Sequence, residues 1–191
     1  MTNNEDNTVS VIDTSSNSVI STVPVGIDPA GVAVSPDGTL VYVTNLAGNT
    51  VSVIDTSSKT VIATITVGEG PKGVAVTPDG AFVYVANSID NTVTVIDTSS
   101  NTVIATVPVG DGPQGVAVSP DGTLVYVTNF AGNTVSVINT ANNTVTATVN
   151  VGFDPIGVAV TPVMCTLFWR FLLARMEKWQ YIWQKQSKKR G

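Results

Sequence analysis

Apolar and polar residues alternate in short runs along the first 162 residues of the chain. In one stretch, Gly73 to Val76 is small and apolar, and Phe82 to Asn87 is β-branched and aromatic. Thr92 to Asp97 then alternates valine with threonine, and Thr102 to Val109 makes a fourth run. A period of two in β-branched residues predicts four β-strands. No 3.6-residue period appears in residues 1–162, which excludes a helical repeat.

Turn residues separate these runs. Pro78-Asp79-Gly80 predicts a tight turn because proline presets φ, aspartate bonds nearby backbone and glycine accepts a positive φ. Polar residues at 99–101 separate the third run from the fourth, and glycine and proline at 110–113 end the fourth. The pattern therefore predicts an antiparallel meander of four strands.

The meander recurs at a fixed period. The sequence at Asn7 to Asp13 returns nearly unchanged at Asn49, Asn91 and Asn133, which is a spacing of 42 residues each time. Four strands in about 40–45 residues predict one blade of a β-propeller. The small first strand suits the crowded centre of a propeller, and Pro108 in the fourth favours the outer edge. A β-helix is the alternative, but its coils are usually shorter and lack a regular Pro-Asp-Gly hairpin.

Three complete repeats are present, preceded by two predicted strands (7–13 and 18–25) and followed by one (157–161). We therefore expect an all-β domain of about four blade equivalents at residues 1–162, and a separate tail at 163–191. Blades of a seven-bladed ring turn by about 50° each, so four blades predict an open arc. Valine-rich blade faces left uncovered at its two ends favour self-association.

Charge and composition argue against two classes of function, nucleic-acid binding and catalysis. Residues 1–162 carry 13 acidic residues against Lys59 and Lys72, a net charge of −11 that argues against nucleic-acid binding. The chain has no histidine, and its one cysteine, Cys165, lies outside the repeats. No catalytic constellation or cofactor motif is visible, so we expect a protein that is not an enzyme and holds no cofactor. The alternative is an enzymatic or ligand-binding propeller whose site is completed by further blades.

Several polar residues recur in step with the repeat and are the candidate site residues. The loop asparagines Asn45, Asn87 and Asn129 could present carboxamides to a ligand. Asparagine is also common in loops, because it tolerates left-handed backbone and its side chain bonds nearby backbone groups. Acids in the connections between blades are weak metal candidates, because one per blade is too sparse for the six to eight oxygens of Ca²⁺. We expect turn formation from the Asp-Gly pairs and inter-blade packing from Tyr42, Tyr84 and Tyr126, with hydroxyls that reach a neighbour's backbone. The connection acids are Asp28, Glu69, Asp111 and Asp154, and the Asp-Gly pairs are Asp37, Gly38, Asp79, Gly80, Asp121 and Gly122.

The second strand of each repeat carries a family signature. Residues 42–45 and 126–129 read Tyr-Val-Thr-Asn, residues 84–87 read Tyr-Val-Ala-Asn, and Ser-Pro-Asp-Gly and Val-Ile-Asp-Thr surround them. Over about 150 residues the chain resembles the YVTN-repeat propellers of microbial surface layers. The resemblance implies a seven-bladed parent, a cell-surface location and a structural or adhesive role with a protein or cell-envelope partner. No signal peptide is visible at the start of this chain.

The tail departs from the repeat after Pro162 and carries seven basic residues against Glu177. Its composition predicts a helix over about 166–185. Three interpretations stay open. The tail is a basic amphipathic helix on a membrane surface, a helix docked on the exposed blade, or an out-of-frame translation of further blades.

Overall fold

The computed structural model describes residues 1–162, and all regular structure in this range is β-strand. Met1–Val160 forms one compact unit. No helix within the described range is long and apolar enough to span a bilayer. The helix predicted for the tail lies outside the described residues.

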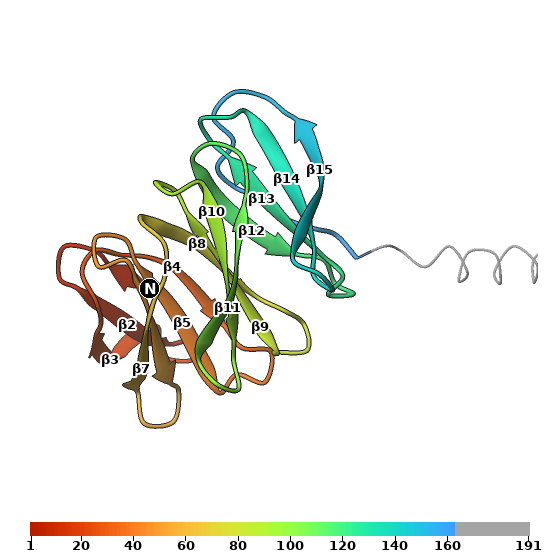
Figure 1. The fold of residues 1–191 in the computed structure, drawn as a ribbon. Helices are drawn as coiled ribbons and strands as arrows, with labels where there is room; N and C mark the ends of the chain where they lie inside the picture. The colour runs from red at the N-terminus through yellow and green to blue at the C-terminus, as the bar shows by residue number, and fades with distance from the viewer. Residues whose placement is uncertain (163–191) are drawn as a thin grey trace, which may run out of the picture. The chain divides into compact units, whose positions relative to one another are not determined.

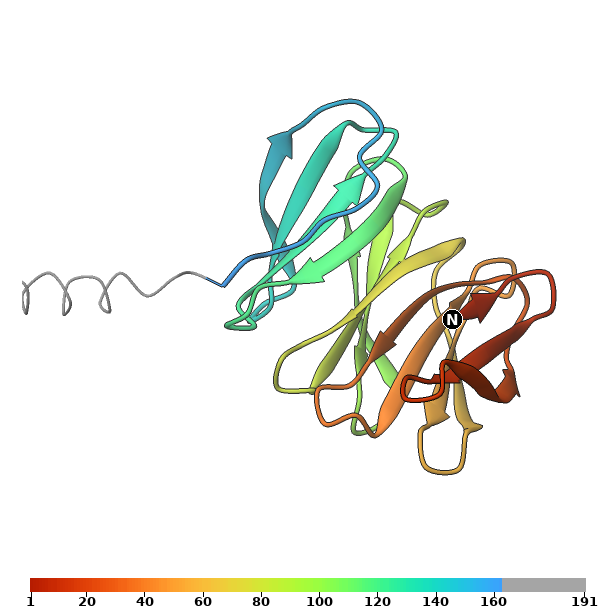
Figure 2. The ribbon, with the colours of Figure 1, turned by 180° about the vertical axis from the view of Figure 1, so that it is seen from behind.

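The strands form four antiparallel sheets in which sequence neighbours pair in order (Figures 1 and 2). The first sheet contains β1 (Thr2–Asn3), β2 (Thr8–Asp13) and β3 (Ser18–Pro24). The second contains β4 (Pro29–Val34), β5 (Leu40–Asn45), β6 (Thr50–Asp55) and β7 (Thr60–Thr66). The third contains β8 (Pro71–Val76), β9 (Phe82–Asn87), β10 (Thr92–Asp97) and β11 (Thr102–Pro108). The fourth contains β12 (Pro113–Val118), β13 (Leu124–Asn129), β14 (Thr134–Asn139) and β15 (Thr144–Asn150).

The register repeats from sheet to sheet. In the third sheet β9 and β10 pair without interruption from Phe82–Asp97 to Asn87–Thr92. The pairing of β10 with the outer strand β11 shifts between Val95 and Ile96, and each other sheet shifts at the equivalent place. Such a bulge re-aims the side chains that follow it and increases the local twist.

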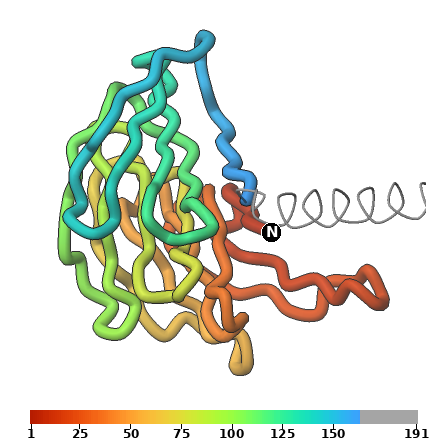
Figure 3. The backbone as a smooth tube through the Cα atoms, turned by 90° about the vertical axis from the view of Figure 1, so that its right-hand side faces the viewer, coloured from red at the N-terminus to blue at the C-terminus, as the bar shows by residue number. Residues whose placement is uncertain are grey.

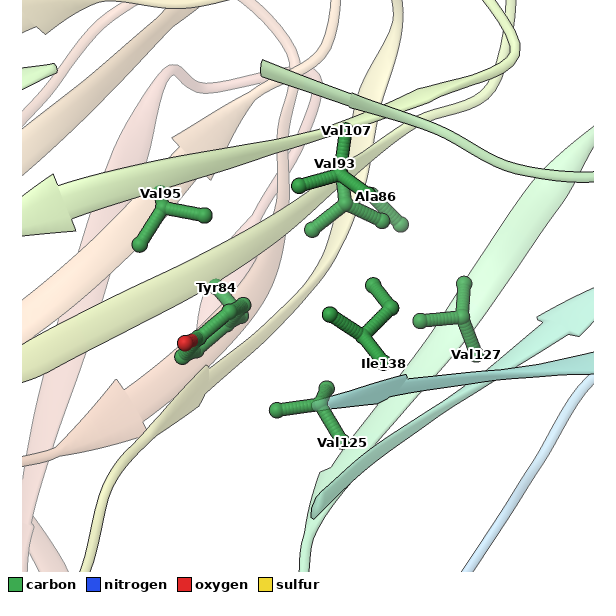
Figure 4. Close-up of a cluster of buried hydrophobic side chains, with 8 residues drawn as sticks. All are labelled: Tyr84, Ala86, Val93, Val95, Val107, Val125, Val127 and Ile138. Atoms are coloured by element: carbon green, nitrogen blue, oxygen red, sulfur yellow. The ribbon is translucent and has the colours of Figure 1, made fainter. Parts of the chain in front are cut away.

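The core lies between sheets, not within one. Figure 4 shows Tyr84, Val93 and Val107 of the third sheet facing Val125 and Ile138 of the fourth. All five side chains are buried, and an equivalent cluster joins the second sheet to the third. Each blade therefore completes its core only when the next blade covers it, as a repeat architecture requires.

The inner strands approach at a glycine in each blade. A Cβ built on Gly73 of β8 would collide with the backbone oxygen of Gln114 in β12, and Gly31 meets Lys72 in the same way. The hydroxyl of Thr44 donates to the carbonyl oxygen of Lys72 at 2.7 Å, which adds a hydrogen bond across the same contact. The small first run predicted from the sequence is thus the innermost strand of each blade, and it contacts the innermost strands of the neighbouring blades. Figure 3 traces the successive sheets along the chain from red to blue.

Two strand predictions need correction. The first sheet has three strands, not two, because Thr2–Asn3 pairs with β2 as β1. Thr2 and Asn3 of β1 lie 42 residues before Thr44 and Asn45, so β1 is the repeat equivalent of the end of β5. The predicted strand at 157–161 is not formed, since these residues pair with no strand in the described range. No hydrogen bond joins the first sheet to the last among residues 1–162.

Candidate functional site

The Asp-Gly pairs lie in the turn between the first two strands of each complete blade. Asp37 accepts hydrogen bonds from the Ser35 hydroxyl at 2.6 Å and from the Thr39 amide at 3.1 Å, and Gly38 has a φ of 74°. These hydrogen bonds lower the pKa of Asp37, and the bond from the Ser35 hydroxyl is the largest cause. Asp79 and Asp121 make the equivalent bonds and have lowered pKa values too.

Sequence reasoning missed a second set of carboxylates on the same side of the sheets. Asp13, Asp55 and Asp97 end β2, β6 and β10, and each accepts hydrogen bonds from the serines two and three residues further on. The serine hydroxyl two residues on is the main cause that lowers the pKa of Asp13 and Asp55 to about 2. The recurring Asp-Thr-Ser-Ser motif was the available signal. We call the side that holds both sets of turns the turn face.

A polar pocket of about 240 Å³ lies on the turn face between the second and third sheets. Its walls include Asp37 and Tyr42 from one blade and Asp79 from the next. Tyr42 is fully buried, and its hydroxyl has no hydrogen-bond partner. Burial, and then the charge of Asp37, raises the pKa of Tyr42. The pocket is lined by two carboxylates with lowered pKa values and by serine and threonine hydroxyls.

The equivalent tyrosine in the third sheet is tied across the blade interface. The Tyr84 hydroxyl donates to Oδ1 of Asn143 at 2.9 Å, from β9 to the outer turn of the fourth sheet. We expected a bond to backbone, but the partner is the side chain of the turn residue Asn143, whose φ is 51°. Burial, followed by the charge of Asp79, raises the pKa of Tyr84 to about 12.

The loop asparagines Asn45, Asn87 and Asn129 are fully buried, so they do not form a ring presented to solvent. The Nδ2 of Asn87 donates to Thr92 at 3.0 Å and to Thr94 at 2.8 Å. Asn45 and Asn129 make the same two bonds. Each amide thus binds the start of the next strand.

A second asparagine holds the chain between blades. Asn49 and Asn91 have φ values of 52° and 57° and end the loop between the second and third strands. Their Oδ1 atoms accept from the amides of Gly70 and Gly112 at 3.1 and 2.8 Å. This loop and the connection between blades are therefore joined, and together they form what we call the loop face.

The connection acids Asp28, Glu69, Asp111 and Asp154 lie on the loop face, one in each connection. The structure does not bring them together, because residues 1–162 contain no group of three metal-ligating side chains. Exposed apolar side chains accompany them, including Ile27, Ile89 and Phe153, which is 91% exposed. Sequence reasoning did not predict this mixture of carboxylates and apolar residues.

Two family models match the chain. Residues 2–104, more than half of the chain, match the model described as lactonase, 7-bladed beta-propeller. Residues 74–163 match the model of a YNCE-like beta-propeller. A comparison with curated proteins gave no match.

Solved structures share the fold. Hydrazine synthase of Kuenenia stuttgartiensis is similar at 32% identity with a TM-score of 0.66, over 68% of this chain and 38% of that one. A functionally unknown protein of Desulfotomaculum acetoxidans DSM 771 is 30% identical with a TM-score of 0.60, over 69% and 44%. The chain thus spans less than half the length of either structure.

Proposed function

The chain belongs to the lactonase-type, seven-bladed β-propeller family, and we propose that it serves as a non-catalytic interaction module. Its role is structural or adhesive, and its partner is a protein or a component of the cell envelope. This proposal includes a location at the cell surface, which the Tyr-Val-Thr-Asn repeats support by resemblance.

One observation carries the proposal: the recurring carboxylates of the turn face are committed to their own turns. All six accept hydrogen bonds from neighbouring serine, threonine or backbone groups, and all six have lowered pKa values. A general acid or base works best with a pKa near the operating pH. These carboxylates are anions far from that range, and no histidine is present to replace them.

The loop face supports the binding role. Within residues 1–162 the side chains of the four connection acids accept no hydrogen bond, and Ile27, Ile89 and Phe153 stand exposed near them. Asp90 differs, because it accepts from the amide of Glu69 at 2.7 Å. Apolar side chains ringed by charge are typical of protein-binding surfaces. We assign the partner contact to this face.

Binding is tested by pelleting the whole chain with purified bacterial cell walls. Ile89→Asp should reduce the bound fraction at least about tenfold, because it places a charge at the apolar centre of the contact. Ile20→Asp is the matched control, since Ile20 is 55% exposed but lies on β3 and not on the loop face. Equal binding by both variants would remove the loop face from the proposal.

Lactone hydrolysis is the second candidate function, and the family match favours it. Its site would include groups beyond the described blades. Incubation of the whole chain with γ- and δ-lactones, with and without added divalent cations, separates the two functions. We expect hydrolysis at the buffer rate. A hydrolysis rate above the buffer rate and proportional to protein concentration would replace the interaction module with an enzyme.

A further inference from the structure

The outer strand of each sheet has one edge that pairs with no strand in residues 1–162. β3, β7, β11 and β15 each stand last in their sheet. Neighbouring blades pack on the faces of a sheet, so they do not cover these edges. In β7 every second residue is exposed, and Ile62 is 55% exposed. A free strand edge presents backbone N–H and C=O groups that can pair with another strand.

The register shows which backbone groups of β7 point outward. The amide of Val67 donates to the carbonyl oxygen of Asn49 at 3.0 Å, so the backbone groups of Val67 point toward β6. Residues of an antiparallel pair alternate between bonded and non-bonded positions. Thr66 and Thr64 lie one and three residues earlier in the same unbroken register. Their N–H and C=O groups therefore point away from the sheet.

Two of the four outer strands carry a proline at the position of Thr66. These are Pro24 in β3 and Pro108 in β11, and the residue after each proline donates inward as Val67 does. Proline has no N–H, so it removes the outward donor and blocks strand pairing at the edge. β7 keeps this donor, and β15 keeps it as well with Asn150.

β7 also lacks the other features that commonly protect an edge. Its sequence, Thr60–Thr66, contains no charged residue. Charges, prolines and bulges are the usual means of preventing unwanted pairing. The register shift opposite Val53 and Ile54 affects the first half of the strand and leaves Ala63 to Thr66 regular. The second half of β7 is therefore a regular and open edge.

The charge around β7 favours a basic partner. Residues 1–162 carry a net charge of −11. Asp55 pairs with the first residue of β7, and Glu69 follows the last residue by three positions. Lys59, in the turn before the strand, is the single base along this edge. Complementary charge attracts a partner and selects its orientation, whereas an acidic segment would be repelled.

We infer that β7 accepts, as a fifth strand of its sheet, an extended segment of a partner protein. Main-chain hydrogen bonds to Thr64 and Thr66 hold the segment, in the mode known as strand addition. β-branched residues at its centre pair best with the exposed threonines and Ile62. Basic residues at its ends match Asp55 and Glu69. This inference does not depend on the partner contact proposed for the loop face.

A labelled synthetic peptide tests the inference by fluorescence anisotropy. In the peptide, threonine alternates with valine and lysines stand at both ends. The whole chain carries Asn150→Pro, which closes the equivalent position of β15. We expect a Kd of about 100 µM. Thr66→Pro should weaken binding at least about tenfold, because it removes a backbone donor. Thr66→Ala keeps the N–H and should bind as the parent does.

The repeat supplies a matched gain of binding. Pro108→Thr restores the outward donor in β11, so the bound peptide should rise from about one to about two per chain. Thr66→Pro should fold, because β3 and β11 hold proline at the same position. Far-UV circular dichroism checks the fold of each variant. Amide hydrogen exchange of the segment at 60–66 should slow when the peptide is bound.

Three results would overturn the inference. Equal binding by Thr66→Pro and Thr66→Ala would show that the backbone donor is not used. Equal binding of a peptide with prolines at its centre and the same lysines would show adsorption by charge alone. A dimer that forms without peptide and is lost in Thr66→Pro would assign the edge to a second copy of the chain.

Discussion

The hydroxyl groups of two equivalent tyrosines should differ in their effect on stability. Tyr84 and Tyr42 are both fully buried, and both occupy the third position of the second strand. The Tyr84 hydroxyl is bonded to Asn143, whereas that of Tyr42 has no partner. Substitution of each by phenylalanine removes one oxygen and leaves the ring in place.

The expected magnitudes follow from this difference. Tyr84→Phe loses one partly buried hydrogen bond between blades, which is worth about 1 kcal/mol net. Tyr42→Phe removes a buried hydroxyl that nothing satisfies, so stability should stay unchanged or rise by up to about 1 kcal/mol. The repeat equivalent of Asn143 is Asn101, whose Oδ1 is also buried and unpartnered. Tyr42 and Asn101 are therefore the same residue types at the same repeat positions as Tyr84 and Asn143, but no hydrogen bond joins them.

Urea unfolding followed by far-UV circular dichroism measures both free energies. Tryptophan fluorescence is unsuitable, because Trp169, Trp179 and Trp183 all lie in the tail. We expect a lower midpoint for Tyr84→Phe at an unchanged slope, and no decrease for Tyr42→Phe. Equal losses in the two variants would refute the reasoning, since they would show that the hydrogen bond between blades is not what distinguishes the two sites.

Three further predictions concern the repeat contacts. Gly73→Ala should lower the free energy of unfolding by about 1–3 kcal/mol because its Cβ meets the next blade's backbone, whereas Gly152→Ala, with open space around it, should have no effect in the same urea assay. Stability should fall as pH drops from about 3.8 to about 2, because Asp13 and Asp55 have lowered pKa values in the folded state; acid titration of Asp13→Asn should show a smaller fall. Stability should also fall as pH rises from about 10 to about 12, because folding raises the pKa of Tyr84, and Tyr84→Phe should reduce this alkaline loss.

The repeat period made most strands predictable from sequence. Four runs per 42 residues, read together with turn chemistry, located β2 to β15, because each copy supports the assignment of the others. The short strand β1 was missed because only Thr2 and Asn3 represent it. The inner strand at 157–161 was predicted from pattern alone, but a strand also needs a partner, and no strand in the described range pairs with it.

The candidate site was less predictable, because it depends on distances between blades. The burial of Asn87 follows from the close approach of Gly68 to its side chain, which a linear sequence does not display. The bond from Tyr84 to Asn143 and the pocket between Asp37 and Asp79 likewise arise only when two blades meet. The turn role of Asp79 was predictable, since its partners lie within two residues.

The central claim is that the recurring polar residues hold the fold. The most direct test is the free energy of unfolding of Asn87→Ala, with exposed Asn4→Ala as the control. Loss of the two bonds from Asn87 to Thr92 and Thr94 should cost roughly 1–2 kcal/mol, since removal of the buried and unpartnered Oδ1 of Asn87 offsets part of the loss. Asn4→Ala should stay within about 0.5 kcal/mol. An Asn87→Ala protein as stable as the control would contradict the claim.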